Sequence, residues 1–183
     1  MSLVAETMLQ RTRAEQAERV FREFRETYPT AGDFSVASES AVKAVTERLG
    51  LHWRGPLLHQ TARQVADLGG SPPEDPTALG SLPGVGPYAS AAWLSLHRNK
   101  RAVIIDSNVV RWLARMTGRP FDGETRRKAW VLELADELTP KKGFRAYNYA
   151  VLDFTMQVCR PKRPICHACP LRPDCQFGSS LNG

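Results

Sequence analysis

Apolar residues recur at helical spacing along most of the chain, between prolines and glycines. The pattern predicts helices over residues 3–13, 14–27, 38–49, 56–68, 76–81, 87–97, 108–117, 124–138 and 144–158. The helix over 38–49 is expected to bury one stripe, formed by Ala41, Ala44, Val45 and Leu49. Residues 103–105 are apolar enough for a strand, but no partner strand is visible. The fold is therefore expected to be all-α.

The composition is that of an ordinary globular protein with a basic bias. The chain has 183 residues, of which 42% are hydrophobic and 24% charged, and its net charge is +6. This charge suits a polyanionic partner such as nucleic acid, although many basic proteins bind none. We see no apolar run of the ~20 residues that a membrane span needs, and no signal peptide, so no membrane partner is expected.

Four cysteines near the end of the sequence carry the strongest chemical signal. Cys159, Cys166, Cys169 and Cys175 are the only cysteines and read C-x6-C-x2-C-x5-C. Such a compact set favours a [4Fe–4S] cluster, which takes one thiolate per iron. A four-thiolate zinc site is the main alternative, because Cys166 and Cys169 form a knuckle, but zinc sites usually show two. Two disulfides are a weaker alternative.

A glycine-rich turn separates two of the predicted helices. Residues 82–88 read L-P-G-V-G-P-Y, and Pro87 suits the first turn of a helix. The pattern predicts a helix–hairpin–helix over about 76–97, whose backbone amides bind DNA phosphates without reading sequence. The expected contacts come from Leu82, Gly84, Val85 and Gly86. The alternative is an ordinary turn between helices.

Two carboxylates are candidates for catalysis. Asp106 follows the apolar residues 103–105 and precedes a helix, so it is either a helix cap or a catalytic group. Glu6 lies within the apolar stretch L-V-A-E-T-M-L. It is either a surface residue of an amphipathic helix or a buried acid, and buried acids are candidates for acid–base chemistry.

Together these motifs resemble the endonuclease III/MutY superfamily of helix–hairpin–helix DNA glycosylases. The resemblance runs from Glu6 to Cys175 and includes I-D-S-N-V-V-R at 105–111. It implies a two-lobed all-α fold, with a six-helix barrel lobe over residues 1–100 and a [4Fe–4S] cluster lobe over residues 101–183. It also implies double-stranded DNA with a mismatched or damaged base as the partner, and a flipped base as the substrate. We expect a monomer that is cytoplasmic and nucleoid-associated.

The resemblance also implies roles for three residues. Asp106 matches the essential aspartate that stabilises positive charge on the sugar and helps to place the attacking water. Glu6, in E-T-M-L-Q-R-T, matches a pocket glutamate that protonates adenine or bonds the edge of thymine or uracil. Tyr88 stands where bifunctional relatives have a lysine that forms a Schiff base. Tyrosine cannot do so, which predicts base removal with little strand cleavage.

Other implied DNA contacts lie on both sides of the hairpin. Gln10 matches a residue that fills the gap left by the flipped nucleotide, and Leu51 matches a wedge, although the following Trp53-Arg54-Gly55-Pro56 departs from the family pattern. Arg160, Lys162 and Arg163, between the first two cysteines, are expected to meet phosphates. The alternative for these three is a solvated basic loop.

Three functions follow as hypotheses. The first is a monofunctional glycosylase for thymine or uracil opposite guanine. Tyr88 favours it, and so does the end of the sequence eight residues after Cys175, where typical adenine glycosylases continue into a domain that inspects 8-oxoguanine. The second is an adenine glycosylase acting opposite 8-oxoguanine or guanine. The third is a DNA-binding module without catalysis. The sequence opens within helical residues, which suggests a missing upstream segment.

Overall fold

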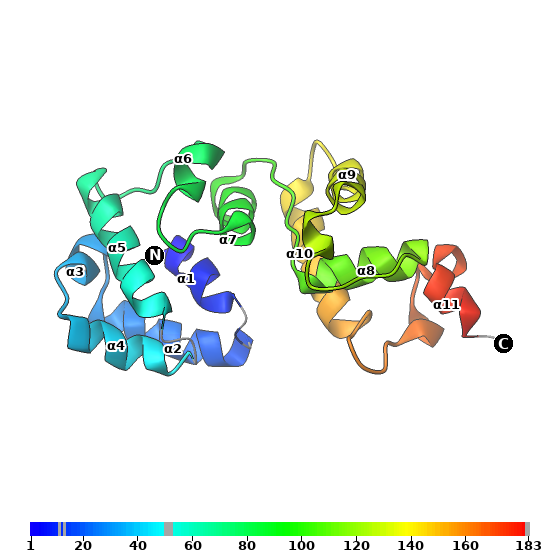
Figure 1. Cartoon of the computed structure of the whole chain (residues 1–183), viewed down its shortest axis with the longest axis horizontal. Helices are drawn as coiled ribbons and strands as arrows, with labels where there is room; N and C mark the ends of the chain where they lie inside the picture. Colours follow the sequence, from blue (N-terminus) through cyan, green and yellow to red (C-terminus); the bar gives the residue numbers. More distant parts are fainter. Residues whose placement is uncertain (11, 13, 50–52, 182–183) are drawn as a thin grey trace. The chain divides into compact units, whose positions relative to one another are not determined.

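The computed structural model describes residues 1–10, 12, 14–49 and 53–181, and within these ranges it is helical and contains no strand (Figure 1). The expected all-α class is confirmed, and residues 103–105 form an irregular segment instead of a strand. The chain forms two compact units, residues 1–98 and residues 99–183. No helix in the described ranges has both the length and the apolar character to cross a membrane.

The first unit packs short helices around an apolar core. Its elements are α1 (Ser2–Leu9), α2 (Ala14–Thr27), α3 (Ala31–Ser35), α4 (Glu39–Glu47), α5 (Arg54–Asp67), α6 (Pro76–Gly80), α7 (Pro87–Ala92) and the π-helical turn η1 (Trp93–His97). Phe24 and Phe34 are fully buried, with ring centroids 4.7 Å apart. Helix α3 was not predicted. It begins with a capping box, in which Thr30 and Asp33 each accept the other's backbone N–H.

The buried face of α4 differs in part from the predicted one, of which Leu49 is buried and Ala41 and Val45 are half-buried. Ala44 is exposed, and Val42 and Thr46 are buried instead. The cause is the close approach of α5, where a Cβ added to Gly55 would lie 2.5 Å from Thr46 Oγ1 and 3.3 Å from Val42 Cγ1. Because Gly55 has no side chain, the two helices meet along the Val42–Thr46 face, which the periodicity of α4 alone does not identify.

The second unit surrounds the buried helix α8. Its elements are α8 (Ser107–Thr117), the 3₁₀ turn η2 (Thr125–Arg127), α9 (Ala129–Leu138), α10 (Phe144–Gln157), the 3₁₀ turns η3 (Cys166–Ala168) and η4 (Arg172–Asp174), and α11 (Gln176–Ser180). Its core includes Val110, Leu113 and Val131. The single helix predicted over 124–138 is interrupted, since Lys128 has an extended backbone. Helix α11 was not predicted because its sequence is short and polar.

Candidate functional site

The hairpin between α6 and α7 is anchored on α5. Gly84 adopts φ +74°, and a Cβ there would lie 3.1 Å from Leu57 Cβ. The Thr61 hydroxyl donates to the Pro83 carbonyl, one turn further along α5. Gly86 has φ −82° and no neighbouring atom within 4 Å of an added Cβ. Of the two glycines, therefore, only Gly84 is required by the backbone of the turn.

The apolar side chains of the hairpin point into the core. Leu82 and Val85 are each 5% exposed, and the Val85 N–H donates to the Leu82 carbonyl at 3.1 Å. Any contact that these two residues make with a partner would therefore come from the main chain. Gly84 is exposed and Gly86 is half-buried.

A small pocket of about 220 Å³ lies beside the hairpin. Its lining includes Gln10, Trp53, Arg54 and Gly84. Gln10 follows α1, and its buried Nε2 has no hydrogen-bond partner among the residues that the structure describes. Trp53 is 51% exposed. The predicted wedge, Leu51, lies outside the described residues.

Glu6 is buried in α1, and its carboxylate meets the end of η1. Its side chain is 7% exposed, and Oε1 lies 2.8 Å from Nε2 of His97, which is 30% exposed. Within the described ranges, His97 is the only hydrogen-bond partner of this side chain. Tyr88 lies in the first turn of α7 and is half-buried.

Asp106 caps the N-terminus of α8 in the second unit. Its Oδ1 accepts the backbone N–H of Asn108 at 2.9 Å and of Val109 at 2.7 Å, and its Oδ2 accepts the side-chain amide of Asn108 at 2.7 Å. Three donors thus hold the carboxylate in one orientation. Capping and catalysis are compatible roles, because a half-buried carboxylate with fixed orientation can still face a ligand.

Arg111 joins this aspartate to the first cysteine through hydrogen bonds. The buried guanidinium donates to Asn108 Oδ1 at 2.9 Å, to the Thr155 carbonyl at 2.8 Å and to the Cys159 carbonyl at 2.8 and 3.1 Å. Burial lowers the pKa of Arg111, but a guanidinium stays protonated in proteins. These acceptors compensate for its removal from water. The contacts connect Asp106, through Asn108, with the start of the cysteine loop.

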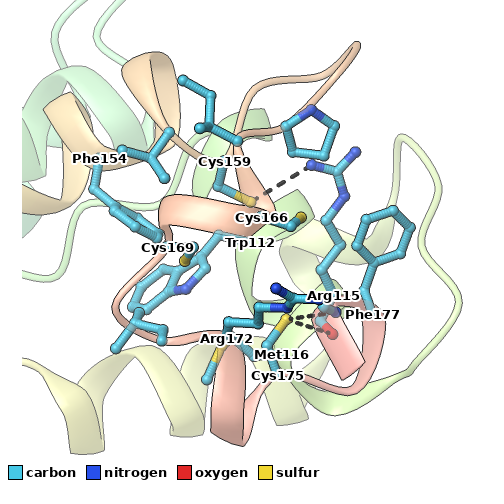
Figure 2. A pocket seen from close by; sticks show the side chains of 15 residues that line it. Trp112, Arg115, Met116, Phe154, Cys159, Cys166, Cys169, Arg172, Cys175 and Phe177 are labelled. Atoms are coloured by element: carbon cyan, nitrogen blue, oxygen red, sulfur yellow. Dashed lines mark hydrogen bonds between the residues drawn. The ribbon is translucent and has the colours of Figure 1, made fainter. Parts of the chain in front are cut away.

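The four cysteines line one pocket of the second unit, of about 350 Å³ and partly open to solvent (Figure 2). Each thiol is half-buried, and the remaining lining is mostly apolar, with Trp112 and Phe154 among its side chains. Cys175 caps α11, its sulfur accepting the Gly178 N–H at 3.3 Å. Within the described ranges, no three His, Cys, Asp or Glu side chains converge as the ligands of one metal ion do.

Electrostatics favour a positively charged group between these sulfurs. Burial raises the pKa of the Cys166 thiol, and charge on the other three cysteines raises it further. Four thiolates would repel one another in this apolar pocket unless bound metal neutralised them. Arg115 supplies part of that charge, because its Nη1 lies 3.5 Å from Cys159 Sγ, and its guanidinium stacks on Phe177 at 4.7 Å. The donor set therefore fits a thiolate-ligated cluster.

A basic loop connects the first two cysteines. Its backbone is held by Arg115, which donates to the carbonyls of Arg160 at 2.7 Å and Pro161 at 3.1 Å. The side chains of Arg160, Lys162 and Arg163 are all exposed. The loop therefore has an anchored backbone with cations on its outer surface.

Three residues of these arrangements were not singled out from the sequence: His97, Arg111 and Arg115. An arginine on the apolar face of α8 was the available signal for Arg111, since a buried cation requires acceptors. His97 gave no signal, because its partner lies 91 positions away in the sequence.

Comparisons with known proteins agree with these arrangements. Residues 4–133 match the family described as "HhH-GPD superfamily base excision DNA repair protein". The chain is 36% identical to the thymine/uracil-DNA glycosylase of Pyrobaculum aerophilum, over 92% of this chain and 76% of that protein. It is 32% identical to the adenine DNA glycosylase of Schizosaccharomyces pombe, over 98% of this chain but only 40% of that protein.

The fold has a close match among solved structures. A thermostable thymine-DNA glycosylase superposes with a TM-score of 0.89 and 30% sequence identity, over 98% of this chain and 83% of that one. This match confirms the helix–hairpin–helix glycosylase fold that the sequence motifs predicted. The chain belongs to the HhH-GPD superfamily of base excision DNA repair proteins.

Proposed function

We propose that the chain is a monofunctional DNA glycosylase that hydrolyses the N-glycosidic bond of thymine or uracil opposite guanine in double-stranded DNA. The observation that carries this proposal is the 36% identity with a thymine/uracil-DNA glycosylase over 92% of the chain. The thermostable thymine-DNA glycosylase supports it through its fold. The enzyme would act as a monomer wherever the cell keeps its DNA, which is the expected cytoplasmic, nucleoid-associated location.

Asp106 is the proposed catalytic carboxylate. Departure of the base leaves positive charge on the sugar, and an oriented carboxylate stabilises that charge without having to reorganise. The three hydrogen bonds from Asn108 and Val109 supply this orientation before any substrate binds. Water then adds to the sugar, so that the products are a free base and an abasic site.

Tyr88 accounts for the proposed lack of strand cleavage. A Schiff base needs an amine, and a phenol cannot replace one. In the first unit, Glu6 is proposed to bond the flipped base and Gln10 to enter the gap left in the duplex. The buried Gln10 Nε2, unpartnered within the described ranges, suits that role because a base could accept its N–H.

DNA binding is proposed to use main-chain and cationic contacts. The amides of the hairpin, at Leu82, Gly84, Val85 and Gly86, would bind phosphates at the start of α7. Arg160, Lys162 and Arg163 would contribute further, salt-sensitive phosphate contacts. We also propose that the first unit is the barrel lobe and the second the cluster lobe.

A [4Fe–4S] cluster is the proposed cofactor of the second unit. Cys159, Cys166, Cys169 and Cys175 would hold it, one thiolate to each iron. When bound, the cluster supplies positive charge and cross-links the loop, and it takes no part in bond cleavage. A single zinc ion is the less favoured alternative, because four-thiolate zinc sites usually show two C-x2-C knuckles and this chain has one, formed by Cys166 and Cys169.

One assay tests this function. Purified protein is incubated with end-labelled duplexes that carry T·G, U·G or A opposite 8-oxoguanine, and strand breaks are compared with and without alkali. We expect breaks at T·G and U·G only after alkali. Breaks without alkali would contradict the proposed role of Tyr88. Preferred cleavage at adenine would establish the second candidate function, which the similarity to adenine glycosylases supports.

Asp106→Asn separates chemistry from folding. Asparagine caps helices as well as aspartate does, but it would place its NH₂ against that of Asn108, at a cost of about 1 kcal/mol. We expect excision to fall at least about 100-fold while duplex binding is kept. The matched control is Asp122→Asn, because Asp122 also accepts a backbone N–H in this unit, from Glu124 at 3.0 Å. Wild-type turnover by Asp106→Asn would refute the catalytic assignment.

A further inference from the structure

We infer that His97 is a positioning residue that fixes Glu6 as a hydrogen-bond acceptor and thereby selects bases with an N–H at the centre of their pairing edge. This inference rests on the proposed function, because it assumes that Glu6 meets the flipped base. It begins from the 2.8 Å contact between His97 Nε2 and Glu6 Oε1.

The His97–Glu6 contact is built into the packing of α1 against η1. Two side-chain hydrogen bonds join these elements. Trp93 Nε1 donates to Ser2 Oγ at 3.0 Å. His97 and Glu6, each four residues later in its own element, form the second. The π-helical turn begins at Trp93 and ends at His97. Single π-helical turns of this kind are frequent at functional sites.

The pair combines a buried acid with an imidazole that reaches solvent. The Glu6 side chain is 7% exposed and that of His97 is 30% exposed. The neighbouring cation, Arg98, is bound to Glu74 and stacks on Trp93, so it is held away from this role. In the Nε2–H tautomer of its imidazole, His97 donates to Oε1 of Glu6 across this 2.8 Å contact, and the inference assigns that tautomer to His97.

This arrangement decides what Glu6 can offer a base. An ionised carboxylate is only an acceptor. His97 contacts Oε1, and within the described ranges Oε2 has no hydrogen-bond partner. Thymine and uracil present N3–H at the centre of the Watson–Crick edge, which Oε2 could accept. Adenine presents the acceptor N1 there and cytosine the acceptor N3, and both would face the carboxylate unfavourably. The pair thus matches the proposed substrates and opposes excision of normal cytosine.

A double-mutant cycle tests the inference with single-turnover excision at U·G. His97→Leu removes the donor, and we expect it to slow excision about 10- to 100-fold, the range for a lost hydrogen bond to a charged group. His97→Gln keeps an N–H donor of similar reach and is expected to stay within about threefold of wild type. If His97 acts through Glu6, adding His97→Leu to the Glu6→Gln variant should change its excision rate less than about threefold.

The outcomes separate this inference from the proposed function. If His97→Leu slowed excision by the same factor in the wild-type protein and in Glu6→Gln, the positioning role would be overturned. Equal slowing by His97→Leu and His97→Gln would overturn it as well. Neither result would affect the proposed function. A wild-type enzyme that excises no base would overturn the proposed function and this inference with it. Thermal melting and binding to undamaged duplex should be unchanged in His97→Gln, which shows that its rates report on chemistry and not on folding.

Discussion

Gly84→Ala should destabilise the hairpin in a way that can be worked out from its geometry. The φ of +74° costs an L-residue about 1–2 kcal/mol. The new Cβ would lie 3.1 Å from Leu57 Cβ, and relieving that contact adds up to about 1 kcal/mol. Alanine also lowers the conformational entropy of the unfolded chain, which stabilises the folded protein by about 0.4–1 kcal/mol. The mid-range values of these three contributions sum to a net loss of about 1.3 kcal/mol, which lowers Tm by about 3–5 °C for a chain of this length.

Gly86→Ala is the matched control in the same motif. Its backbone suits any residue, and an added Cβ meets no atom within 4 Å. Alanine in place of glycine at the N-cap of α7 costs about 0.7 kcal/mol, and the lower conformational entropy of the unfolded chain offsets it by about 0.4–1 kcal/mol. We therefore expect Tm to stay within about 2 °C of wild type.

Paired measurements then separate stability from binding. Thermal melts followed by circular dichroism give the first, and titration of an undamaged duplex gives the second. If hairpin amides bind phosphate, Gly86→Ala should weaken duplex binding without lowering Tm, whereas Gly84→Ala should lower both. A Gly84→Ala protein that melts like wild type, or a Gly86→Ala protein that melts as low as Gly84→Ala, would refute the reasoning.

Three further predictions concern the second unit. Arg111→Gln should lower the free energy of unfolding by about 2–4 kcal/mol, because the carbonyls of Thr155 and Cys159 lose their buried donor; urea denaturation measures this, and an unchanged midpoint would contradict it. Lys162→Gln should reduce the slope of log affinity against log salt by about 1 and leave excision at saturating enzyme unchanged; an unchanged slope would show that Lys162 is only solvated. Removal of iron with oxidant and chelator should bleach the protein and speed proteolysis of the cysteine loop, and reconstitution should reverse both; equal cleavage before and after would argue against a bracing cluster.

Local sequence was sufficient for most of the helices. The periodicity predicted every helix of eight residues or more in the described ranges, because apolar residues recur at helical spacing along each of them. It missed α3 and α11, which have five residues each, too few for a period to show. It also misplaced part of the buried face of α4: Leu49 is buried as predicted, but Ala44 is exposed, and Val42 and Thr46 are buried where Gly55 of α5 approaches.

By itself the sequence determined the chemical inventory of this protein: four thiols in one short segment, a glycine hairpin, and an aspartate at the start of a helix. These are local features, so spacing along the chain was enough to find them. Only the tertiary structure decided the partners of the charged groups. Glu6 meets His97 across 91 positions, and Arg111 reaches Cys159 across 48. A buried charge needs a partner, but any of many distant residues could provide one, and the packing of the helices selects which one does.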